Sequence, residues 1–320
     1  MNIVITGSIA FDYLMSFPGQ FRDHILPDRL DRLSLSFLVE SLVRRPGGIA
    51  ANIAYTLALL GERPKVMATV GPDFEEHRRW LEDQGVDTSA IKIVPDLLTA
   101  SFFVSTDRAN AQIASFFPGA MAQARQLSFR QLEDRPDLAV VSPNDPAAMV
   151  AYCRECSELG IPYFYDPSQQ IVRLSAEELQ EGIAHARALF CNDYEFGLIE
   201  TKTGLNLAAI LETTEFVVIT RGEDGAEVNT REGRQAVPAI PPEHLVDPTG
   251  IGDAFRGGFL KGYARGLNLE RCAEMGALAA TYCLEAEGPQ SHCFDLKAFL
   301  ERFRQHFDDH GELDRLMDPV

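Results

Sequence analysis

The chain has 320 residues, of which 46% are hydrophobic and 24% are charged, as in an ordinary globular protein. Its 29 basic and 47 acidic residues give a formal net charge of −18. Nucleic acids and anionic membranes would be repelled by such a surface, so we expect neither as a partner. No apolar run approaches the roughly 18 residues that a membrane span needs, and residues 1–5 carry no basic leader. We expect a single cytoplasmic α/β domain over residues 1–320, with its six cysteines reduced.

Short apolar runs predict buried strands, and helical patterns separate them. The predicted strands are residues 2–6, 138–142, 162–166, 188–192 and 216–220. Alternation of strands and helices predicts a mostly parallel central sheet with helices on both faces. Several of these runs end in polar residues, and ligands bind beyond the carboxyl ends of such strands. One edge of the sheet is therefore the expected site.

Three helix starts are visible in the sequence. Asp145 is a predicted N-cap with Pro146 at the first helical position, and Ser128 and Ser175 each begin a capping-box pattern. The last helix is an amphipathic pattern that begins near Leu296 and is followed by an acidic tail.

Two pairs of residues have a spacing that occurs in metal sites. Cys153 and Cys156 lie three apart, and His306 and His310 lie four apart. Neither pair has a clear further ligand nearby in the sequence, so a shared helix face and a solvated face are the favoured interpretations.

Two segments, about 11–45 and 97–118, break the strand–helix rhythm. Residues 33–37 alternate with period two, and residues 98–117 form two β patterns joined by a turn near 107–110. Four phenylalanines lie in the second segment, at positions 102, 103, 116 and 117, which is more than a half-solvated hairpin can bury alone. We predict a small inserted sheet that covers a ligand, a partner chain, or both.

The motif with the clearest chemistry is DPTGIGDAF at residues 247–255. Gly250 and Gly252 precede a helical stretch, so backbone N–H groups can gather there and bind an anion. Asp253 in the first turn suits a base that takes a proton from a hydroxyl as it attacks a phosphoryl group. The alternative is that Asp253 only favours the helix dipole. The sequence contains no P-loop motif, and the glycine spacing does not match a dinucleotide fingerprint.

Two glycine-containing segments allow a binding interpretation and a plain one. Gly47 and Gly48 precede Asn52, and paired glycines let a ligand approach the backbone, although they are also common in turns. Thr220-Arg-Gly222-Glu-Asp-Gly225 follows a predicted strand and either contacts phosphates or simply connects two strands.

Two acidic segments leave the same choice open. Asn192-Asp-Tyr-Glu195 carries oxygen ligands suited to Mg²⁺ through water, or forms a helix cap. Asp12 lies just beyond the first strand, where a carboxylate can bind a diol or remain a solvated turn residue.

Taken together and in this order, the motifs resemble the ribokinase-like (PfkB) carbohydrate kinase family, from Gly7 to about residue 293. The combination of GGIAAN at 47–52 with DPTGIGDAF at 247–255 is specific for that family. Further segments are similar to bacterial adenosine kinases: residues 7–19, 33–39, 111–121, 166–170 and 192–195. The resemblance implies a ribokinase-like three-layer α/β fold with an inserted β-sheet lid.

The resemblance also implies roles for individual residues. Asp253 is the expected catalytic base, with Gly250, Ile251 and Gly252 as the anion hole. The expected substrate contacts are Ser8, Asp12, Ser36, Gly47, Gly48 and Asn52 around the sugar, Phe102 and Phe116 stacked on the base, and Gln169 and Gln170 near it.

For the phosphate donor, the resemblance implies ATP contacts from Asn192, Thr220, Gly222 and Gly225. Glu195 is the expected Mg²⁺ contact through water, and Asp247 and Thr249 are the expected contacts of K⁺. The late segment 285–291 matches the family's cation loop only loosely.

The implied reaction is transfer of the ATP γ-phosphoryl group to the 5′-hydroxyl of adenosine, as in purine salvage, by a homodimer joined through the lid sheet. Guanosine and inosine are further possible nucleosides. Two alternatives stay open: a sugar kinase for ribose or fructose, which would not need Phe102, and a nucleoside sensor without catalysis, against which the intact segment 250–253 argues.

Overall fold

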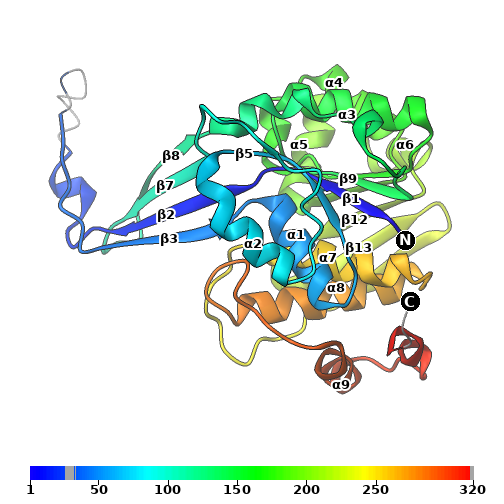
Figure 1. Ribbon diagram of the computed structural model, residues 1–320. Coiled ribbons are helices and arrows are strands. Elements are labelled where there is room, and N and C mark those ends of the chain that lie inside the picture. Colours follow the sequence, from blue (N-terminus) through cyan, green and yellow to red (C-terminus); the bar gives the residue numbers. More distant parts are fainter. Residues whose placement is uncertain (26–31, 33, 318–320) are drawn as a thin grey trace.

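The computed structural model describes residues 1–25, 32 and 34–317, and its centre is an eight-stranded sheet in the order β14-β13-β12-β11-β10-β9-β1-β4 (Figure 1). The strands are β1 Ile3–Thr6, β4 Lys65–Met67, β9 Leu138–Val141, β10 Tyr163–Tyr165, β11 Ala188–Asn192, β12 Phe216–Thr220, β13 Ala226–Thr230 and β14 Gly233–Val237. Six of them, from β4 to β12 in this order, are parallel, whereas β13 and β14 are antiparallel. The five strands predicted from apolar runs are confirmed.

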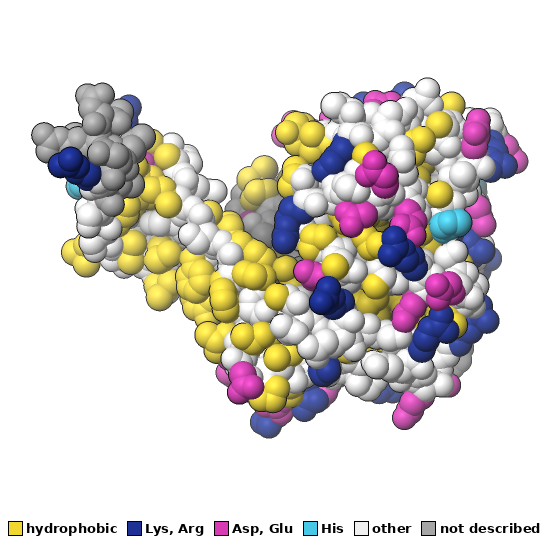
Figure 2. Space-filling model, turned by 90° about the horizontal axis from the view of Figure 1, so that it is seen from above, with side chains coloured by type: hydrophobic (Ala, Val, Ile, Leu, Met, Phe, Trp, Pro, Cys, Tyr) yellow, Lys and Arg dark blue, Asp and Glu magenta, His cyan; other side chains and the backbone are white. Residues whose placement is uncertain are grey.

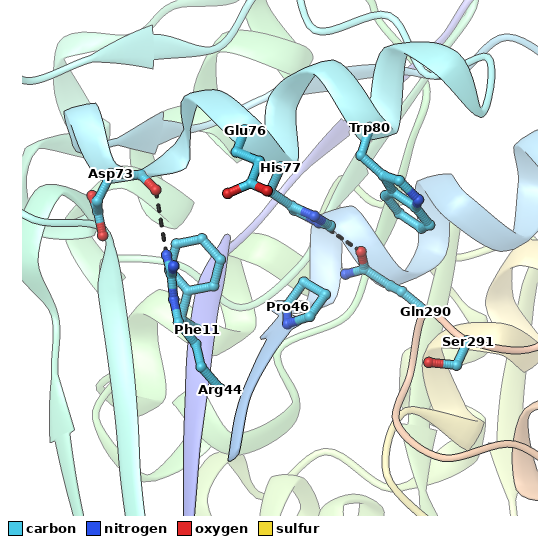
Figure 3. Close-up of a pocket in the computed structure, with 9 residues that line it drawn as sticks. All are labelled: Phe11, Arg44, Pro46, Asp73, Glu76, His77, Trp80, Gln290 and Ser291. Atoms are coloured by element: carbon cyan, nitrogen blue, oxygen red, sulfur yellow. Dashed lines mark hydrogen bonds between the residues drawn. The ribbon is translucent and has the colours of Figure 1, made fainter. Parts of the chain in front are cut away.

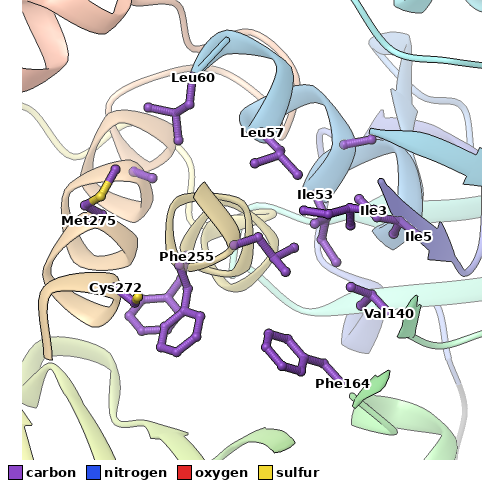
Figure 4. Close-up of a cluster of buried hydrophobic side chains, with 14 of the residues drawn as sticks. Ile3, Ile5, Ile53, Leu57, Leu60, Val140, Phe164, Phe255, Cys272 and Met275 are labelled. Carbon is purple, nitrogen blue, oxygen red and sulfur yellow. The ribbon is translucent and has the colours of Figure 1, made fainter. Parts of the chain in front are cut away.

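Helices cover both faces of this sheet (Figure 1). One face packs on α1 Ile49–Leu59, α7 Ile251–Ala264 and α8 Leu269–Leu284, and the other on α3 Pro146–Leu159, α4 Ala176–Ala184, α5 Asp193–Thr203 and α6 Leu207–Leu211. Alternate side chains of one strand enter different layers: Ile3 and Ile5 join the α7 side, shown in Figure 4, and Val4 joins the α3 side. This three-layer arrangement confirms the predicted fold class.

A second sheet projects from the main body as an extended arm (Figure 1). Its order is β3-β2-β7-β8, with β2 Ala10–Ser16, β3 Ser41–Gly47, β7 Ala100–Thr106 and β8 Gln112–Phe117. We call these four strands the lid sheet. The two strands expected between 98 and 117 are confirmed as β7 and β8.

The strand expected at residues 33–37 is wrong. Leu33 lies outside the described residues, residues 34–39 have no regular secondary structure, and the inserted segment about 11–45 instead supplies its strands to the lid sheet as β2 and β3. Phe37 explains the difference, because its ring packs on Phe17 and Phe21 with centroids 4.9 and 5.0 Å apart. A loop whose apolar side chains pack against the protein can show the same alternation of apolar and polar residues as a strand.

Most predicted helix starts are confirmed. Asp145 caps α3 through the amide of Ala148, and Ser175 opens α4 with a complete capping box. Ser128 begins only a three-residue 3₁₀ turn, because its hydroxyl and the next amide bind the carboxylate of Glu155 and the chain then leaves for β9.

The C-terminal amphipathic helix is confirmed as α9 Leu296–His306, with Phe299 and Phe303 buried. All six cysteines are free, and the C-x-x-C pair lies buried in α3. Within the described ranges, no three His, Cys, Asp or Glu side chains are grouped so as to hold a metal. In the same part of the chain, no helix combines the length and apolar character that crossing a membrane requires.

Remaining short elements connect the lid sheet to the body. The strands β5 Thr69–Val70 and β6 Lys92–Ile93 pair in parallel, and α2 Glu75–Asp83 lies between them in the chain. Figure 1 shows α2 beside α1, close to the base of the lid sheet.

Candidate active site

The base of the lid sheet is fixed to the main sheet at Gly48. This residue adopts φ +95°, and a Cβ there would lie 2.6 Å from the Cα of Ile9, so only glycine fits. Ser8 replaces the missing N-cap side chain of α1, because its Oγ accepts a hydrogen bond of 3.2 Å from the amide of Ile49. The lid strands β2 and β3 therefore leave the body at a fixed angle beside the carboxyl end of β1.

One face of the lid sheet carries the residues expected to hold a substrate. Asp12 lies opposite Arg45 on one side and Phe102 on the other, and Phe102 lies opposite Phe116. Gly47 leaves room for Asp12, since a Cβ at Gly47 would come within 2.8 Å of its Oδ2. A carboxylate and two aromatic rings on one face can contact a ribose and its base together.

Burial raises the pKa of Asp12 to about 6, the positive charge of Arg45 opposes this shift, and the charge of Asp247 adds to it. Ser36 is exposed and lies in the segment 34–39, which has no regular secondary structure, and just after this segment the amide of Glu40 donates to the carbonyl of Ser16 at the end of β2. The sugar contact that the family resemblance implies for Ser36 stays a prediction.

The N-terminus of α7 has the geometry of an anion site. Gly250 is the N-cap at φ +81°, and a Cβ there would come within 2.3 Å of the Cβ of Pro289, so its glycine identity is doubly required. Among the residues that the structure describes, the amides of Gly250, Ile251 and Gly252 have no hydrogen-bond acceptor. These three N–H groups are available to an anion.

Asp253 lies in the first turn of α7, beside these amides. Its Oδ2 accepts a hydrogen bond of 2.8 Å from Nδ2 of Asn52. Burial raises the pKa of Asp253 to about 7, while Arg256 and the bond from Asn52 oppose the shift and Asp166 adds to it. A carboxylate with a pKa near neutrality is suited to accept a proton in catalysis.

Arg256 was not anticipated from the sequence, although it lies one turn after Asp253. Its guanidinium pairs with Asp166 at the end of β10 through Nη2–Oδ1 at 2.9 Å and Nε–Oδ2 at 2.5 Å, and Nη1 donates to the carbonyl of Gly252. The pair is buried, so it joins α7 rigidly to the sheet edge. The i, i+3 spacing from Asp253 was the available signal.

The turn after β10 separates the two predicted glutamines. Gln169 is exposed, whereas Gln170 is buried and its Oε1 has no partner within the described ranges. Ser168 holds a left-handed backbone (φ +36°) and donates to Asp166. Unpaired buried polar atoms and backbone strain concentrate at ligand sites.

The expected ATP residues meet at the neighbouring strand ends. Asn192 is the register partner of Thr220 across β11 and β12. Gly225 adopts φ +87°, and a Cβ there would lie 2.1 Å from the carbonyl oxygen of Val237, while Gly222 is exposed with open space beside it. Asn192 and Glu195 form a reciprocal capping box at the start of α5, so these two residues do form the helix cap that was the alternative to a Mg²⁺ contact.

Asp247 is already engaged by donors. Its Oδ2 accepts from Nη1 of Arg45 and from the amide of Gly288, each at 3.1 Å, and its Oδ1 accepts from the amide of Thr249 at 2.9 Å. Arg45 also pairs with Glu287. A guanidinium on the carboxylate that was expected to bind K⁺ supplies the positive charge itself, so the Asp247 carboxylate does not fit a resident monovalent cation.

Comparison with known proteins places these observations in a family. The model described as pfkB family carbohydrate kinase matches residues 15–295. The nucleoside kinase of Burkholderia thailandensis, solved in complex with inosine, is similar at a TM-score of 0.86 and 35% identity, covering 95% of this chain and 98% of that one. The nucleoside kinase of Methanocaldococcus jannaschii is 27% identical over 95% of this chain and 97% of its own. The cytidine kinase of Thermococcus kodakarensis is 30% identical over 91% and 99%.

Proposed function

Because the chain belongs to the pfkB family of carbohydrate kinases, we propose that it transfers the γ-phosphoryl group of ATP to the 5′-hydroxyl of a purine nucleoside, with adenosine and inosine among its substrates. The observation that carries this proposal is Asp253, whose pKa burial raises to about 7, beside three unpaired amides at the start of α7. The adjoining lid face supplies the rest of a nucleoside site.

Each of the proposed substrate-binding residues contacts a different part of the nucleoside. Asp12 binds the ribose hydroxyls, and the rings of Phe102 and Phe116 stack on the base. A 5′-hydroxyl directed at Asp253 then loses its proton to the carboxylate as it attacks, and the amides of residues 250–252 stabilise the charge of the transferring phosphoryl group. The fixed geometry supports this proposal, because α7 is tied to the sheet edge through Arg256 and Asp166.

Gln170 supports purine breadth beyond adenosine. Gln170 is buried, its Oε1 has no partner within the described residues, and its primary amide carries one acceptor and two donors. In one orientation the amide matches the amino group and ring nitrogen of adenine, and after rotation by 180° it matches the N–H and carbonyl of hypoxanthine. The inosine complex of the Burkholderia thailandensis relative agrees with this range.

The donor is bound at the ends of β11 and β12, through Asn192, Thr220, Gly222 and Gly225. Mg²⁺ usually reaches such sites with the nucleotide phosphates and takes only one or two protein carboxylates, often through water. Glu195 fits that requirement, since only one of its oxygens is used in the capping box, and bound Mg²⁺ would neutralise phosphate charge there.

We further propose a homodimer through the lid sheet. The lid face opposite Asp12 exposes Leu42, Phe103, Ile113 and Phe117, with exposed fractions from 38% to 61%. Figure 2 shows hydrophobic side chains along this arm. A second copy of the chain would remove them from water.

The test is a panel of adenosine, inosine, guanosine, cytidine, ribose and fructose with Mg²⁺ and ATP, read as ADP released in a coupled assay. Purine nucleosides should give the highest kcat/KM. Loss of a stacked base costs on the order of 1–3 kcal/mol, so Phe102→Ala should raise the nucleoside KM by roughly 5- to 150-fold. Ser115→Ala, on the opposite face of the neighbouring strand β8, is the control and should leave the nucleoside KM close to that of the parent.

Three results would contradict the proposal. A preference for ribose or fructose, with Phe102→Ala unchanged, would favour the sugar kinase alternative. Nucleoside binding by calorimetry without ADP release would favour a sensor. Phosphorylation of pyrimidine nucleosides alone would exclude the purine assignment.

A further inference from the structure

The segment 287–292 after α8 lies directly behind the catalytic groups, and the proposed function leaves most of it without a role. Pro289 packs against Gly250, the amide of Gly288 donates to Asp247, and His292 lies 3.0 Å from the hydroxyl of Thr56 on α1. Gln290, in the middle of this segment, is 4% exposed and makes two side-chain hydrogen bonds.

Those two bonds extend the catalytic hydrogen bond into a chain of three. Nε2 of His77 lies 2.8 Å from Oε1 of Gln290, Nε2 of Gln290 donates to Oδ1 of Asn52 at 2.7 Å, and Nδ2 of Asn52 donates to Oδ2 of Asp253 at 2.8 Å. The chain therefore links α2, the 287–292 segment, α1 and α7. Figure 3 shows its outer end, where His77 points at Gln290.

The direction of every bond in the chain is set by the carboxylate at its inner end. Ionised Asp253 can only accept, so Asn52 must present its NH₂ group, and its oxygen then faces Gln290. Gln290 must in turn present its NH₂ to Asn52 and its oxygen to His77. His77 must therefore carry a proton on Nε2. Burial lowers the pKa of His77 to about 4, so the ring is neutral at physiological pH and this proton defines its tautomer.

The ring of His77 is held firmly in this orientation. It stacks on Trp80 at 5.0 Å with an interplanar angle of 17°, and it meets Phe74 edge-on at 5.4 Å. A cavity of about 440 Å³ lies beside it, lined in part by Phe11, Arg44 and Trp80 (Figure 3).

We propose that His77 and Gln290 are positioning residues that fix the orientation of the Asn52 amide, so that Asn52 holds Oδ2 of Asp253 and leaves Oδ1 to accept the substrate proton. An asparagine amide without an oriented partner can rotate by 180° and turn its oxygen toward the carboxylate, which would repel the ionised form. The inference rests on the proposed function, because it assigns a role in the same proton transfer.

Charged and titratable groups lie around both ends of the hydrogen-bond chain, Asp253 and His77, and they contribute to the expected pH dependence. Asp253 faces Arg256 on its own helix, Asp166 after β10, Glu195 on α5 and Cys283 on α8. His77 faces Arg44 on β3, and Asp73 and Glu76 line the same cavity. None of these groups is changed by the substitutions below.

The first experiment measures the pH profile of kcat in Gln290→Leu, which removes both bonds at similar size. We expect the acid limb of the profile to move upward by about one pH unit, with kcat at pH 7 at least about fivefold lower, since a lost hydrogen bond to the ionised form raises its pKa. Ser291→Ala is the control, because Ser291 follows Gln290 in the sequence and lines the same cavity as His77 but is not part of the hydrogen-bond chain. This variant should keep the pH profile of the parent.

A second pair of variants separates orientation from general loss of structure. His77→Gln keeps an N–H donor and should retain the acid limb, whereas His77→Phe keeps a ring without the donor and should shift the limb in the same direction as Gln290→Leu. An unchanged limb in folded Gln290→Leu or His77→Phe would overturn the inference, and so would equal shifts in both His77 variants.

The two proposals can fail separately. If the parent turns over no nucleoside, the proposed function fails, and the hydrogen-bond chain is tested without activity. The pH dependence of the difference in Tm between the parent and Asp253→Asn then reports the carboxylate pKa, and Gln290→Leu, introduced into both proteins, should move that dependence upward. No movement would contradict the orienting role regardless of catalysis.

Discussion

Asp253→Asn should inactivate the protein and at the same time stabilise it. The folded pKa of Asp253 is raised above its unfolded value, so the folded state binds the proton more readily. The stabilising contribution is therefore complete below the unfolded pKa and is lost as pH rises through about 7. Above that pH the ionised carboxylate destabilises the fold, and asparagine removes this cost while still accepting the hydrogen bond from Asn52.

The size of the effect follows from the pKa. The difference between 3.8 and about 7 corresponds to about 4 kcal/mol, as an upper bound. For a chain of 320 residues this corresponds to a rise in Tm of at most about 6 °C. Loss of a general base should lower kcat by at least about 100-fold, with nucleoside binding retained.

The assay is a pair of thermal melts, parent and Asp253→Asn, at about pH 8 and about pH 4.5, together with kcat in the coupled ADP assay. The variant should be more stable at the higher pH, and the difference should shrink toward zero at the lower one. The reasoning about this carboxylate would be refuted if the parent and Asp253→Asn had the same Tm at both pH values. It would also be refuted if the kcat of the variant were near that of the parent.

Three other predictions concern pH, cations and assembly. The kcat of the parent should fall below about pH 7 as Asp253 takes up a proton, and a flat profile down to pH 5 would contradict this. Activity should be the same in potassium as in tetramethylammonium chloride, because Arg45 occupies Asp247, whereas Arg45→Gln should become dependent on potassium; potassium activation of the parent would be evidence against this assignment. Ile113→Glu on the exposed lid face should convert a dimer to a monomer in light scattering, and a parent that is already monomeric at micromolar concentration would exclude the dimer.

The sequence predicts well what depends on local pattern. Apolar runs such as 216–220 locate the strands, and Asp145 and Ser175 locate helix starts, because capping and burial are decided within a few residues. The glycines at 48 and 250 were found for the same reason, since positive φ and close approach leave only glycine.

The sequence predicts poorly what depends on contacts between distant segments. Gln290 meets Asn52 from 238 residues away, and Arg45 meets Asp247 from 202 residues away. The residues of each pair are too far apart in the sequence for any spacing pattern to predict their contact. Arg256 was visible at i, i+3 from Asp253, but only its contact with Asp166 shows why it is there.

The central claim is that Asp253 activates the 5′-hydroxyl of a nucleoside toward ATP. Its most direct test is to incubate the protein with Mg²⁺, ATP and inosine or adenosine, and to identify the products by ³¹P NMR, with the 5′-deoxynucleoside as the matched control. We predict equal amounts of ADP and nucleoside 5′-monophosphate from the parent, and neither from the control or from Asp253→Asn. A phosphate on the 2′- or 3′-oxygen, or full product formation by Asp253→Asn, would contradict the account.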